Sequence, residues 1–340
     1  MVHPACKDFI TKLPKAELHV HIEGTMEPSM LLAFARRNNV NVPSGILDAS
    51  GNYSFSGFNQ FIDTYFLATQ VLCTQQDFYE LTLAYLKKVA DQGVVRTEIF
   101  FELQSYLLRN IGPDIIIGGM HQAFVEGKRL YNIDGAMILC FLRHLSEESA
   151  FEALALLDDY RDKVIGVGLA AYELNNPPSK FERVFAKARL QGYHVVAHAG
   201  ELSVETIQQS IHQLACERID HGVTCLQDKA LVNTLLQRKI PLTLCPLSNI
   251  VLKIFNTIQE HPLKKLFDTG LVVTINSDDP AFFGGYIAEN YLVAAEELGF
   301  FCKDLVLCAR NSLVASFADE KIKKNYLEQL SKYVAAHCCK

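Results

Sequence analysis

The sequence has no basic segment, no long hydrophobic run and no C-x-x-C pair. Its 340 residues include 32 Lys and Arg against 38 Asp and Glu, a formal net charge of −6, so the basic surface of a nucleic-acid-binding protein is not expected. No apolar run approaches the roughly 20 residues of a membrane-spanning helix. Residues 1–12 lack the apolar core of a signal peptide. These absences predict a protein with neither a nucleic-acid nor a membrane partner.

The ten cysteines are irregularly spaced along the chain. Without a C-x-x-C pair, a zinc ribbon or a dithiol redox motif is not expected. Most of the cysteines lie in apolar segments, where a free thiol behaves as a small hydrophobic side chain. A cytoplasmic protein with reduced thiols is the simplest interpretation, and Cys338 and Cys339 are predicted to be exposed thiols.

What the sequence does contain is an alternation of short apolar segments with longer amphipathic ones. Most of the eight short segments are almost continuously hydrophobic, as expected for parallel strands buried on both faces. The eight segments are Glu17–His21, Val94–Phe101, Ala136–Leu142, Val164–Leu169, His194–His198, Arg218–His221, Ile240–Cys245 and Val272–Asn276. The amphipathic segments predict helices at Asp77–Gln92, Ile115–Tyr131, Glu147–Arg161, Ser179–Gln191, Ser203–Ala215 and Asp228–Gln237.

Repeated strand–helix units predict an α/β fold, namely a TIM (β/α)8 barrel. An open doubly wound sheet is the alternative, but no G-x-G-x-x-G motif follows the first strand. Residues Pro28–Leu72 form an insertion after that strand, with a loop near Val42–Gly57 and an aromatic-rich helix at Phe58–Leu72. We expect a lid over the barrel mouth, although an insertion without a function is equally open. Residues Tyr286–Lys340 predict three extra helices, and the whole chain, 1–340, is predicted to be a single domain.

The stretch Leu18–Gly24 (LHVHIEG) contains two histidines two residues apart. Successive side chains of a strand alternate between its faces, so His19 and His21 lie on the same face. Two imidazoles held close together on a rigid strand suit a zinc ion. Two ordinary polar residues at a strand end are the alternative.

Three other predicted strands also end in groups that bind metals or transfer protons. These ends are His198–Glu201, Asp220–Gly222 and Ser277–Pro280. Active sites of barrels lie at the C-terminal ends of the strands. We therefore expect one metal ion, with room for a water, to be bound by His19, His21, His198 and Asp278. Binuclear metal barrels that this chain resembles usually bridge two ions with a carboxylated lysine at the end of the fourth strand. The fourth predicted strand here, Val164–Leu169, does not end in a lysine, so one zinc per chain is predicted.

The remaining polar groups at these strand ends suit hydrolysis. A zinc ion lowers the pKa of a bound water from about 15.7 to about 7, and His221 lies within reach to take the proton of that water or hold it in place. Glu201 can carry a proton to a ring nitrogen of the substrate, and Asp279 can face the substrate. The alternative for Glu201 and Asp279 is a structural role as helix N-caps or ion-pair partners.

Five motifs resemble those of the adenosine and adenine deaminases, which are metal-dependent hydrolase barrels. They are Pro14–Gly24 (PKAELHVHIEG), His198–Glu201 (HAGE), Arg218–Gly222 (RIDHG), Cys245–Asn249 (CPLSN) and Asn276–Pro280 (NSDDP). The resemblance runs nearly end to end. It implies that the same four residues bind zinc, that Glu201 carries a proton to purine N1, and that His221 orients the attacking water. It also implies that Asp279 hydrogen-bonds purine N7, and that attack at C6 releases ammonia.

The residue at position 23 bears on which purine is the substrate. Adenosine deaminases usually have H-x-H-x-D-G, in which the Asp contacts ribose, whereas this chain has Glu23. The extra methylene would push the carboxylate into space that ribose would use, a change worth about 1–3 kcal/mol. The stretches Phe141–Glu148, Pro177–Phe181 and Asp279–Tyr286 also resemble the adenine deaminase branch. The resemblance therefore implies zinc-dependent deamination of adenine to hypoxanthine and ammonia, a step of purine salvage.

Two loops depart from that branch. The chain has Gly168–Glu173 (GLAAYE) where the branch usually has GLDSSE, and Phe101–Tyr106 (FELQSY) where it usually has F-D-P-Q-x-H. Both loops are predicted to end at the barrel mouth. Adenosine, or an N6-substituted or otherwise modified purine, therefore stays open as a substrate, as does a purine-binding pseudoenzyme with little or no turnover.

Two other enzyme classes are disfavoured by what the sequence lacks. Phosphoesterases that share H-x-H usually need two or three ions and basic groups for phosphate, but few Lys or Arg lie at the predicted strand ends. Zinc deaminases acting on nucleic acids use H-x-E with P-C-x-x-C. His21–Glu23 matches the first half, but no P-C-x-x-C occurs. A small-molecule purine is therefore the expected partner.

Overall fold

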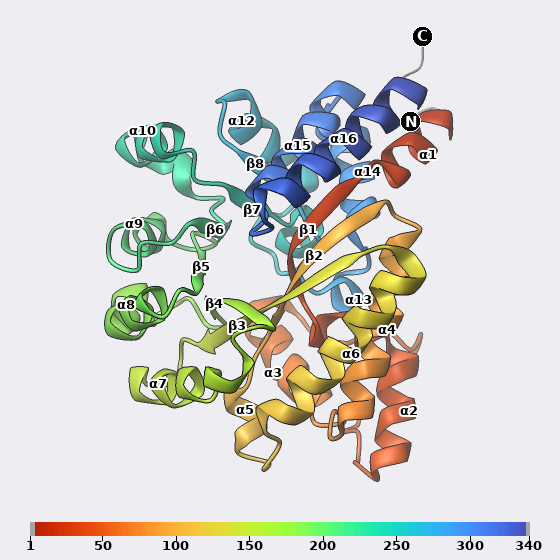
Figure 1. The fold of residues 1–340 in the computed structure, drawn as a ribbon, viewed down its shortest axis with the longest axis vertical. Helices are drawn as coiled ribbons and strands as arrows, with labels where there is room; N and C mark the ends of the chain where they lie inside the picture. Colours follow the sequence, from red (N-terminus) through yellow and green to blue (C-terminus); the bar gives the residue numbers. More distant parts are fainter. Residues whose placement is uncertain (1–3, 338–340) are drawn as a thin grey trace.

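Eight parallel strands follow one another in sequence order around a barrel (Figure 1). The structure is a computed structural model that describes residues 4–337, so Cys338 and Cys339 lie outside the described residues. The strands are β1 (Lys15–His21), β2 (Val94–Phe101), β3 (Asp134–Leu142), β4 (Val164–Ala170), β5 (His194–Ala199), β6 (Arg218–His221), β7 (Leu242–Leu244) and β8 (Val273–Ile275). A parallel bridge between Val20 and Asp278 brings β1 next to the segment after β8. The predicted TIM barrel is confirmed, and the open doubly wound sheet is excluded.

Strands β7 and β8 are shorter than predicted. The N-terminal end of β7 is limited by Pro241, which has no N–H to donate to a neighbouring strand. At its other end, Cys245 is already the N-cap of helix α11 (Pro246–Val251). After β8, the side chain of Asn276 binds the backbone of β1, since its Oδ1 accepts the Leu18 N–H at 2.9 Å. These two strands therefore end at residues whose backbone or side chain takes part in contacts other than strand pairing.

Helices surround the strands, as the sequence predicted (Figure 1). Those close to predicted positions are α4 (Gln75–Ala90), α6 (Pro113–Tyr131), α7 (Glu147–Ala155), α8 (Glu182–Leu190), α9 (Val204–His212) and α10 (Lys229–Arg238). Short helices α5 (Gln104–Leu107), α11, α12 (Leu263–Asp268) and α13 (Pro280–Phe283) fill the connections. Helix α7 ends before the predicted Arg161, and a 3-10 turn at Asp158–Tyr160 follows it.

The insertion after β1 contains helices α2 (Pro28–Asn38) and α3 (Gly57–Thr69). It packs on the segment that follows β8. Tyr53 stacks on Phe282 with ring centroids 3.8 Å apart, and Phe61 lies 4.8 Å from Phe283. The insertion therefore lies across the C-terminal ends of the first and last strands, where a lid was predicted.

The three C-terminal helices are present as predicted, namely α14 (Ile287–Glu297), α15 (Cys302–Ala315) and α16 (Glu320–His337). Helix α15 packs against β1 and β8 at the opposite end of the barrel, where Ser312 Oγ accepts the Ala16 N–H at 2.9 Å. Helix α1 (Pro4–Lys12) was not predicted, and Phe9 on it stacks on Tyr333 of α16 at 5.5 Å. Among the helices of residues 4–337, none has the length and apolar character needed to cross a bilayer.

Asp77 is the polar link between the insertion and the outer helices. Its Oδ2 accepts hydrogen bonds from the N–H groups of Thr74 and Cys73, at 2.7 and 3.0 Å, and from Asn38 Nδ2 at 2.8 Å, while Arg37 pairs with Oδ1. The carboxylate is buried. Replacing Asp77 with Ala leaves these donors without an acceptor, so the free energy of unfolding should fall by about 2–3 kcal/mol in urea denaturation.

The matched control for this variant is Glu80→Ala. Glu80 pairs with the same Arg37, at 2.9 Å, but its side chain is 37% exposed. A surface ion pair contributes at most about 1 kcal/mol. Equal losses of unfolding free energy for the two variants would show that the Asp77 network does not hold the insertion in place.

Candidate active site

The four predicted metal ligands meet at one end of the barrel. β1 supplies His19 and His21, β5 supplies His198, and Asp278 follows β8. Their ligand atoms all lie within 4.8 Å of one another. His21 Nε2 is 3.0 Å from His198 Nε2, and His19 Nε2 is 3.2 Å from Asp278 Oδ1. The structure thus brings together side chains that are up to 259 positions apart (278 − 19) in the sequence.

The orientation of His19 suits a metal ion at the centre of this group. Its Nδ1 lies 2.9 Å from Thr243 Oγ1, and the Thr243 hydroxyl donates to Asp220 Oδ1 at 2.8 Å. Since that hydroxyl donates to Asp220, it must accept from Nδ1–H of His19, which directs Nε2 toward Asp278 and the centre of the cluster. Nε2 is buried and makes no hydrogen bond. Nε2 faces the Asp278 carboxylate at 3.2 Å, a position from which it can bind zinc once it carries no proton.

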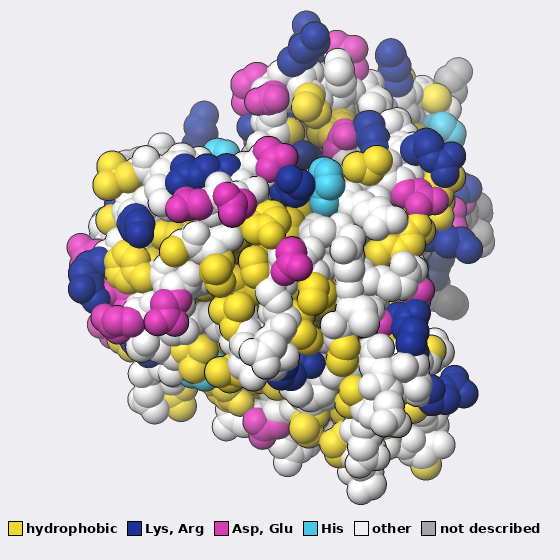
Figure 2. Space-filling model, turned by 60° about the horizontal axis from the view of Figure 1, so that its bottom comes forward, with side chains coloured by type: hydrophobic (Ala, Val, Ile, Leu, Met, Phe, Trp, Pro, Cys, Tyr) yellow, Lys and Arg dark blue, Asp and Glu magenta, His cyan; other side chains and the backbone are white. Residues whose placement is uncertain are grey.

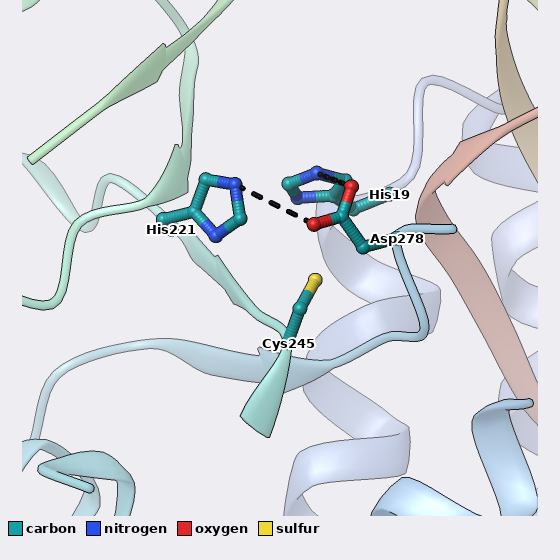
Figure 3. A group of neighbouring side chains, drawn as sticks. All are labelled: His19, His221, Cys245 and Asp278. Carbon is teal, nitrogen blue, oxygen red and sulfur yellow. Dashed lines mark ion pairs between the residues drawn. The ribbon is translucent and has the colours of Figure 1, made fainter. Parts of the chain in front are cut away.

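A second cluster overlaps the first and includes Cys245 (Figure 3). It consists of His19, His221, Cys245 and Asp278, whose ligand atoms also lie within 4.8 Å of one another. In Figure 3 the Cys245 sulfur points toward the gap between the His221 ring and the Asp278 carboxylate. Burial, and then the carboxylates of Asp278 and Asp220, raise the pKa of the Cys245 thiol well above its ordinary value. A metal ion would itself lower the pKa of a coordinating thiol, so the zinc content of variants, rather than this pKa shift, decides between the two clusters.

Two site residues have left-handed backbone conformations that glycine normally adopts. The φ angles are 69° at His221 and 66° at Asp278. Such a conformation costs a non-glycine residue about 1–3 kcal/mol and is found where the surrounding structure enforces it, often at functional sites. At Asp278 the enforcing contacts are visible, since His21 N–H donates to its carbonyl at 3.0 Å and Ser248 Oγ donates to Oδ2 at 2.7 Å.

Glu201 and His221 lie beside the four predicted ligands. His221 Nε2 is 3.6 Å from Glu201 Oε1 and 3.9 Å from Asp278 Oδ2. Oε1 of Glu201 is buried and makes no hydrogen bond. Burial, followed by the carboxylates of Glu173 and Asp278, raises the pKa of Glu201 well above its usual range. Glu201 is therefore a buried carboxyl group that faces the pocket, and its raised pKa favours the protonated form.

Asp279 also faces the pocket, and Gly24 makes room for it. A Cβ atom at Gly24 would lie 2.0 Å from Asp279 Oδ1, so only glycine fits at this position. Oδ1 of Asp279 is buried and has no hydrogen-bond partner. Burial and the adjacent Asp278 carboxylate raise the pKa of Asp279 well above its usual range. Like Glu201, it is a buried carboxyl group with one oxygen that makes no hydrogen bond.

The pocket in front of these groups has an aromatic wall. It encloses about 580 Å³, including space open to solvent at its mouth. Helix α3 contributes Phe58, Phe61, Ile62, Tyr65 and Phe66 to the lining, so the insertion is a wall of the site. In Figure 2, which brings this end of the barrel forward, apolar side chains run across the middle of the face. The lining suits a flat apolar ring with a few polar atoms.

No Lys or Arg is present among the pocket-lining residues within the described chain. A phosphate group in this pocket would find no cation among those side chains. The absence agrees with the sequence argument against a phosphoesterase, and it also disfavours a nucleotide as substrate.

Glu23 does not line the pocket. Its Oε2 accepts a hydrogen bond from Tyr65 Oη at 3.0 Å, and its Oε1 accepts one from Tyr106 Oη at 3.3 Å. Burial, and then the Glu102 carboxylate, raise the pKa of Glu23 to about 8. The sequence interpretation placed this carboxylate directly in the space of a ribose. The structure places it behind Tyr65, which does line the pocket, so its effect on substrate choice would be indirect.

Both loops that depart from the usual pattern reach the pocket, as predicted from their positions. Glu102, Ala170 and Ala171 are lining residues. Glu102 accepts the Ser105 N–H at 3.0 Å, and burial raises the pKa of its carboxyl to about 7. Sequence reasoning gave no role to the supporting residues Thr243 and Ser248. Ser248 lies within the motif Cys245–Asn249, whereas Thr243 lies in a predicted strand with no motif of its own.

A family model described as adenosine deaminase matches residues 14–333. The chain belongs to the adenosine deaminase family. It is 44% identical to an adenine deaminase of Chlorobium phaeobacteroides, over 96% of this chain and 98% of the relative. It is 43% identical to an adenine deaminase of Wolinella succinogenes, over 96% and 99%. The crystal structure of an adenine deaminase from Arthrobacter aurescens superposes with a TM-score of 0.91 and 37% identity, over 95% of this chain and 99% of that one.

Membership of this family makes the protein a hydrolase that acts on the C–N bond of a cyclic amidine. Deaminases of this family depend on a metal, and the His/Asp cluster is a possible site for it.

Proposed function

We propose that this protein hydrolyses adenine to hypoxanthine and ammonia with one zinc ion per chain, as a step of purine salvage. The observation that carries the proposal is one cluster of three imidazoles and a carboxylate beside a pocket with two buried carboxyl groups, each of which has one oxygen without a hydrogen bond. The identity to relatives named adenine deaminase supports the choice of the free base.

The residues proposed to hold zinc are His19, His21, His198 and Asp278. Zinc at this site would lower the pKa of water and so supply a nucleophile at neutral pH. His19 is aligned for binding by Thr243, and Asp278 by Ser248. Second contacts of this kind orient the ligands of metal sites.

The remaining groups match the polar edge of a purine. N1 and N7 of adenine flank C6 and are both hydrogen-bond acceptors, so each needs a donor from the protein. Glu201 and Asp279 are proposed to be those donors, Glu201 giving its proton to N1 and Asp279 donating to N7. The raised pKa of each carboxyl agrees with this assignment, because a neutral carboxyl group donates and a carboxylate does not. His221 would hold the attacking water or take its proton.

A substrate screen tests the proposal. Purified protein, with zinc counted by elemental analysis, would be assayed for ammonia release from adenine, adenosine, AMP and N6-methyladenine. We expect adenine to have the highest kcat/KM and AMP to be the poorest substrate, since no basic side chain lines the pocket. Binding of zinc and adenine without ammonia release would instead identify a pseudoenzyme.

Replacing Glu23 with Asp should raise the ratio of kcat/KM for adenosine over adenine by about 10-fold, the size expected for 1–3 kcal/mol. The shorter carboxylate withdraws from the Tyr65 hydroxyl, and Tyr65 can then move away from the pocket. The measurement is the pair of kcat/KM values for each protein, with Glu27→Asp, near the same end of the barrel, as the matched control. An unchanged ratio would show that Glu23 does not set selectivity.

The single domain over residues 1–340 is also a proposal. It is supported by the packing of α1 on α14 and of α15 on β1 and β8, which joins both ends of the described chain to the barrel. A cytoplasmic location and the absence of a nucleic-acid or membrane partner stay predictions.

A further inference from the structure

A buried carboxylate outside the pocket lining receives an unusual concentration of hydrogen bonds. Glu173, in the loop after β4, is 4% exposed. Its Oε1 accepts the Gly200 N–H at 3.1 Å, and its Oε2 accepts the Glu201 and Leu202 N–H groups at 3.1 and 3.0 Å. The Thr206 hydroxyl also donates to Oε1. Each carboxylate oxygen therefore binds two donors, and three of the four are consecutive backbone amides.

These amides belong to the segment that carries Glu201. Residues 200–202 lie between the end of β5 and the start of α9, so the barrel sheet does not bind their N–H groups. The turn is tight. Gly200 has φ 76°, and a Cβ atom there would lie 2.3 Å from Ile207 Cδ1. The Gly200 carbonyl accepts from the Thr224 N–H and hydroxyl, both at 3.0 Å. Apart from a second contact of the Gly200 N–H with Thr206 Oγ1 at 2.9 Å, Glu173 is the acceptor for the N–H groups of residues 200–202.

The side chain of Glu201 has little else to fix it. Its Oε1 makes no hydrogen bond, and His221 Nε2 lies 3.6 Å from that atom. The position of its carboxyl group therefore depends on its backbone. A catalytic group displaced by about 1 Å can lose about 10²-fold in rate.

Arg143 also holds the loop after β4 next to the end of β5. It is buried, its Nη1 donates to the His198 carbonyl at 2.9 Å, and its Nε donates to the Asn176 carbonyl at 2.8 Å. It thus joins the end of β5 to the loop that carries Glu173. The guanidinium group also supplies a positive charge near the two buried glutamates.

We infer that Glu173 is a positioning residue, which fixes the proton-carrying Glu201 by binding the backbone amides of residues 200–202. The inference rests on the proposed role of Glu201 in adenine deamination. Glu173 itself does not line the pocket and touches no substrate.

The test is Glu173→Gln in the full-length, zinc-loaded protein. The amide has nearly the same shape, but its one oxygen can accept only two of the four hydrogen bonds, and its NH2 group opposes the others. We expect kcat for adenine to fall by about 10–100-fold, with KM within about threefold and zinc content unchanged. Backbone amides 200–202 should exchange hydrogen faster by mass spectrometry. This exchange measurement does not depend on substrate identity.

Glu205→Gln is the matched control, because Glu205 is an exposed glutamate of the neighbouring helix α9 whose carboxylate accepts from the Gln209 side chain at 3.3 Å. Thr206→Val, which removes one donor to Glu173, is the second variant if Glu173→Gln fails to fold, and a smaller fall in kcat with faster exchange is expected. Exchange and kcat equal to those of the Glu205 control would overturn the inference. So would loss of zinc in step with kcat, which would show a merely structural role.

The same experiment separates this inference from the proposed function. A wild-type protein that releases no ammonia from adenine contradicts the proposed function, while faster exchange of amides 200–202 in Glu173→Gln still supports the contact. A wild-type protein that is active, beside a variant that is equally active, contradicts only the positioning role.

Discussion

Replacing Glu201 with Gln is expected to lower kcat for adenine by about 10²–10⁴-fold, the usual contribution of a general acid or base. The amide has the shape of the carboxyl group and fills the same place beside His221, but it has no acidic proton to give to N1. KM and zinc content should change little, because Glu201 is not one of the four proposed ligands. The measurements are ammonia release under saturating adenine and elemental analysis of the purified variant.

Glu205→Gln again serves as the control, since it makes the same chemical change four positions away on the surface. A Glu201→Gln variant with near wild-type kcat would show that the proton reaches the purine by another route. Loss of zinc from Glu201→Gln would instead mean that the carboxyl group belongs to the metal site.

The second large effect is expected from His198→Ala. This change removes one of the three imidazoles in the proposed ligand set and should release zinc and reduce ammonia production to background. Cys245→Ser is the informative partner, because Cys245 belongs only to the alternative cluster and His198 only to the proposed one. We expect Cys245→Ser to retain one zinc per chain and most of its activity.

Elemental analysis of both variants decides between the two clusters. If Cys245→Ser loses zinc while His198→Ala keeps it, the ion is bound by the cluster drawn in Figure 3. Loss in both variants would place the ion between the two sets, with the thiol as a ligand.

The strands were predictable because their physical signature is local. β2 and β6 have the predicted bounds, and the others differ at their ends. A mostly apolar segment such as Val164–Leu169 is stable as a strand when both of its faces are buried, as they are in a barrel. Helix α1 was missed because the contact that stabilises it is not local in sequence. Phe9 on this helix packs on Tyr333, near the other end of the chain.

The supporting contacts of the site were not predictable in the same way. Thr243, Ser248 and Glu173 act on residues that are far from them in sequence, and no spacing rule connects them. Glu23 is a case in which the motif is visible in the sequence but the direction of the side chain is not. Its motif was visible, but the structure turns its carboxylate toward Tyr65 and Tyr106 and away from the pocket lining.

The amino-acid sequence alone determined the barrel and the set of residues at its mouth. Strand periodicity places His19 and His21 on one face, and parallel strands carry His198 and Asp278 to the same end of the barrel. Only the tertiary structure decided which groups are paired and which are free. Hydrogen bonding and burial depend on loops that meet across the barrel, so the unpaired carboxyls of Glu201 and Asp279, and the amides bound by Glu173, exist only once the chain is folded.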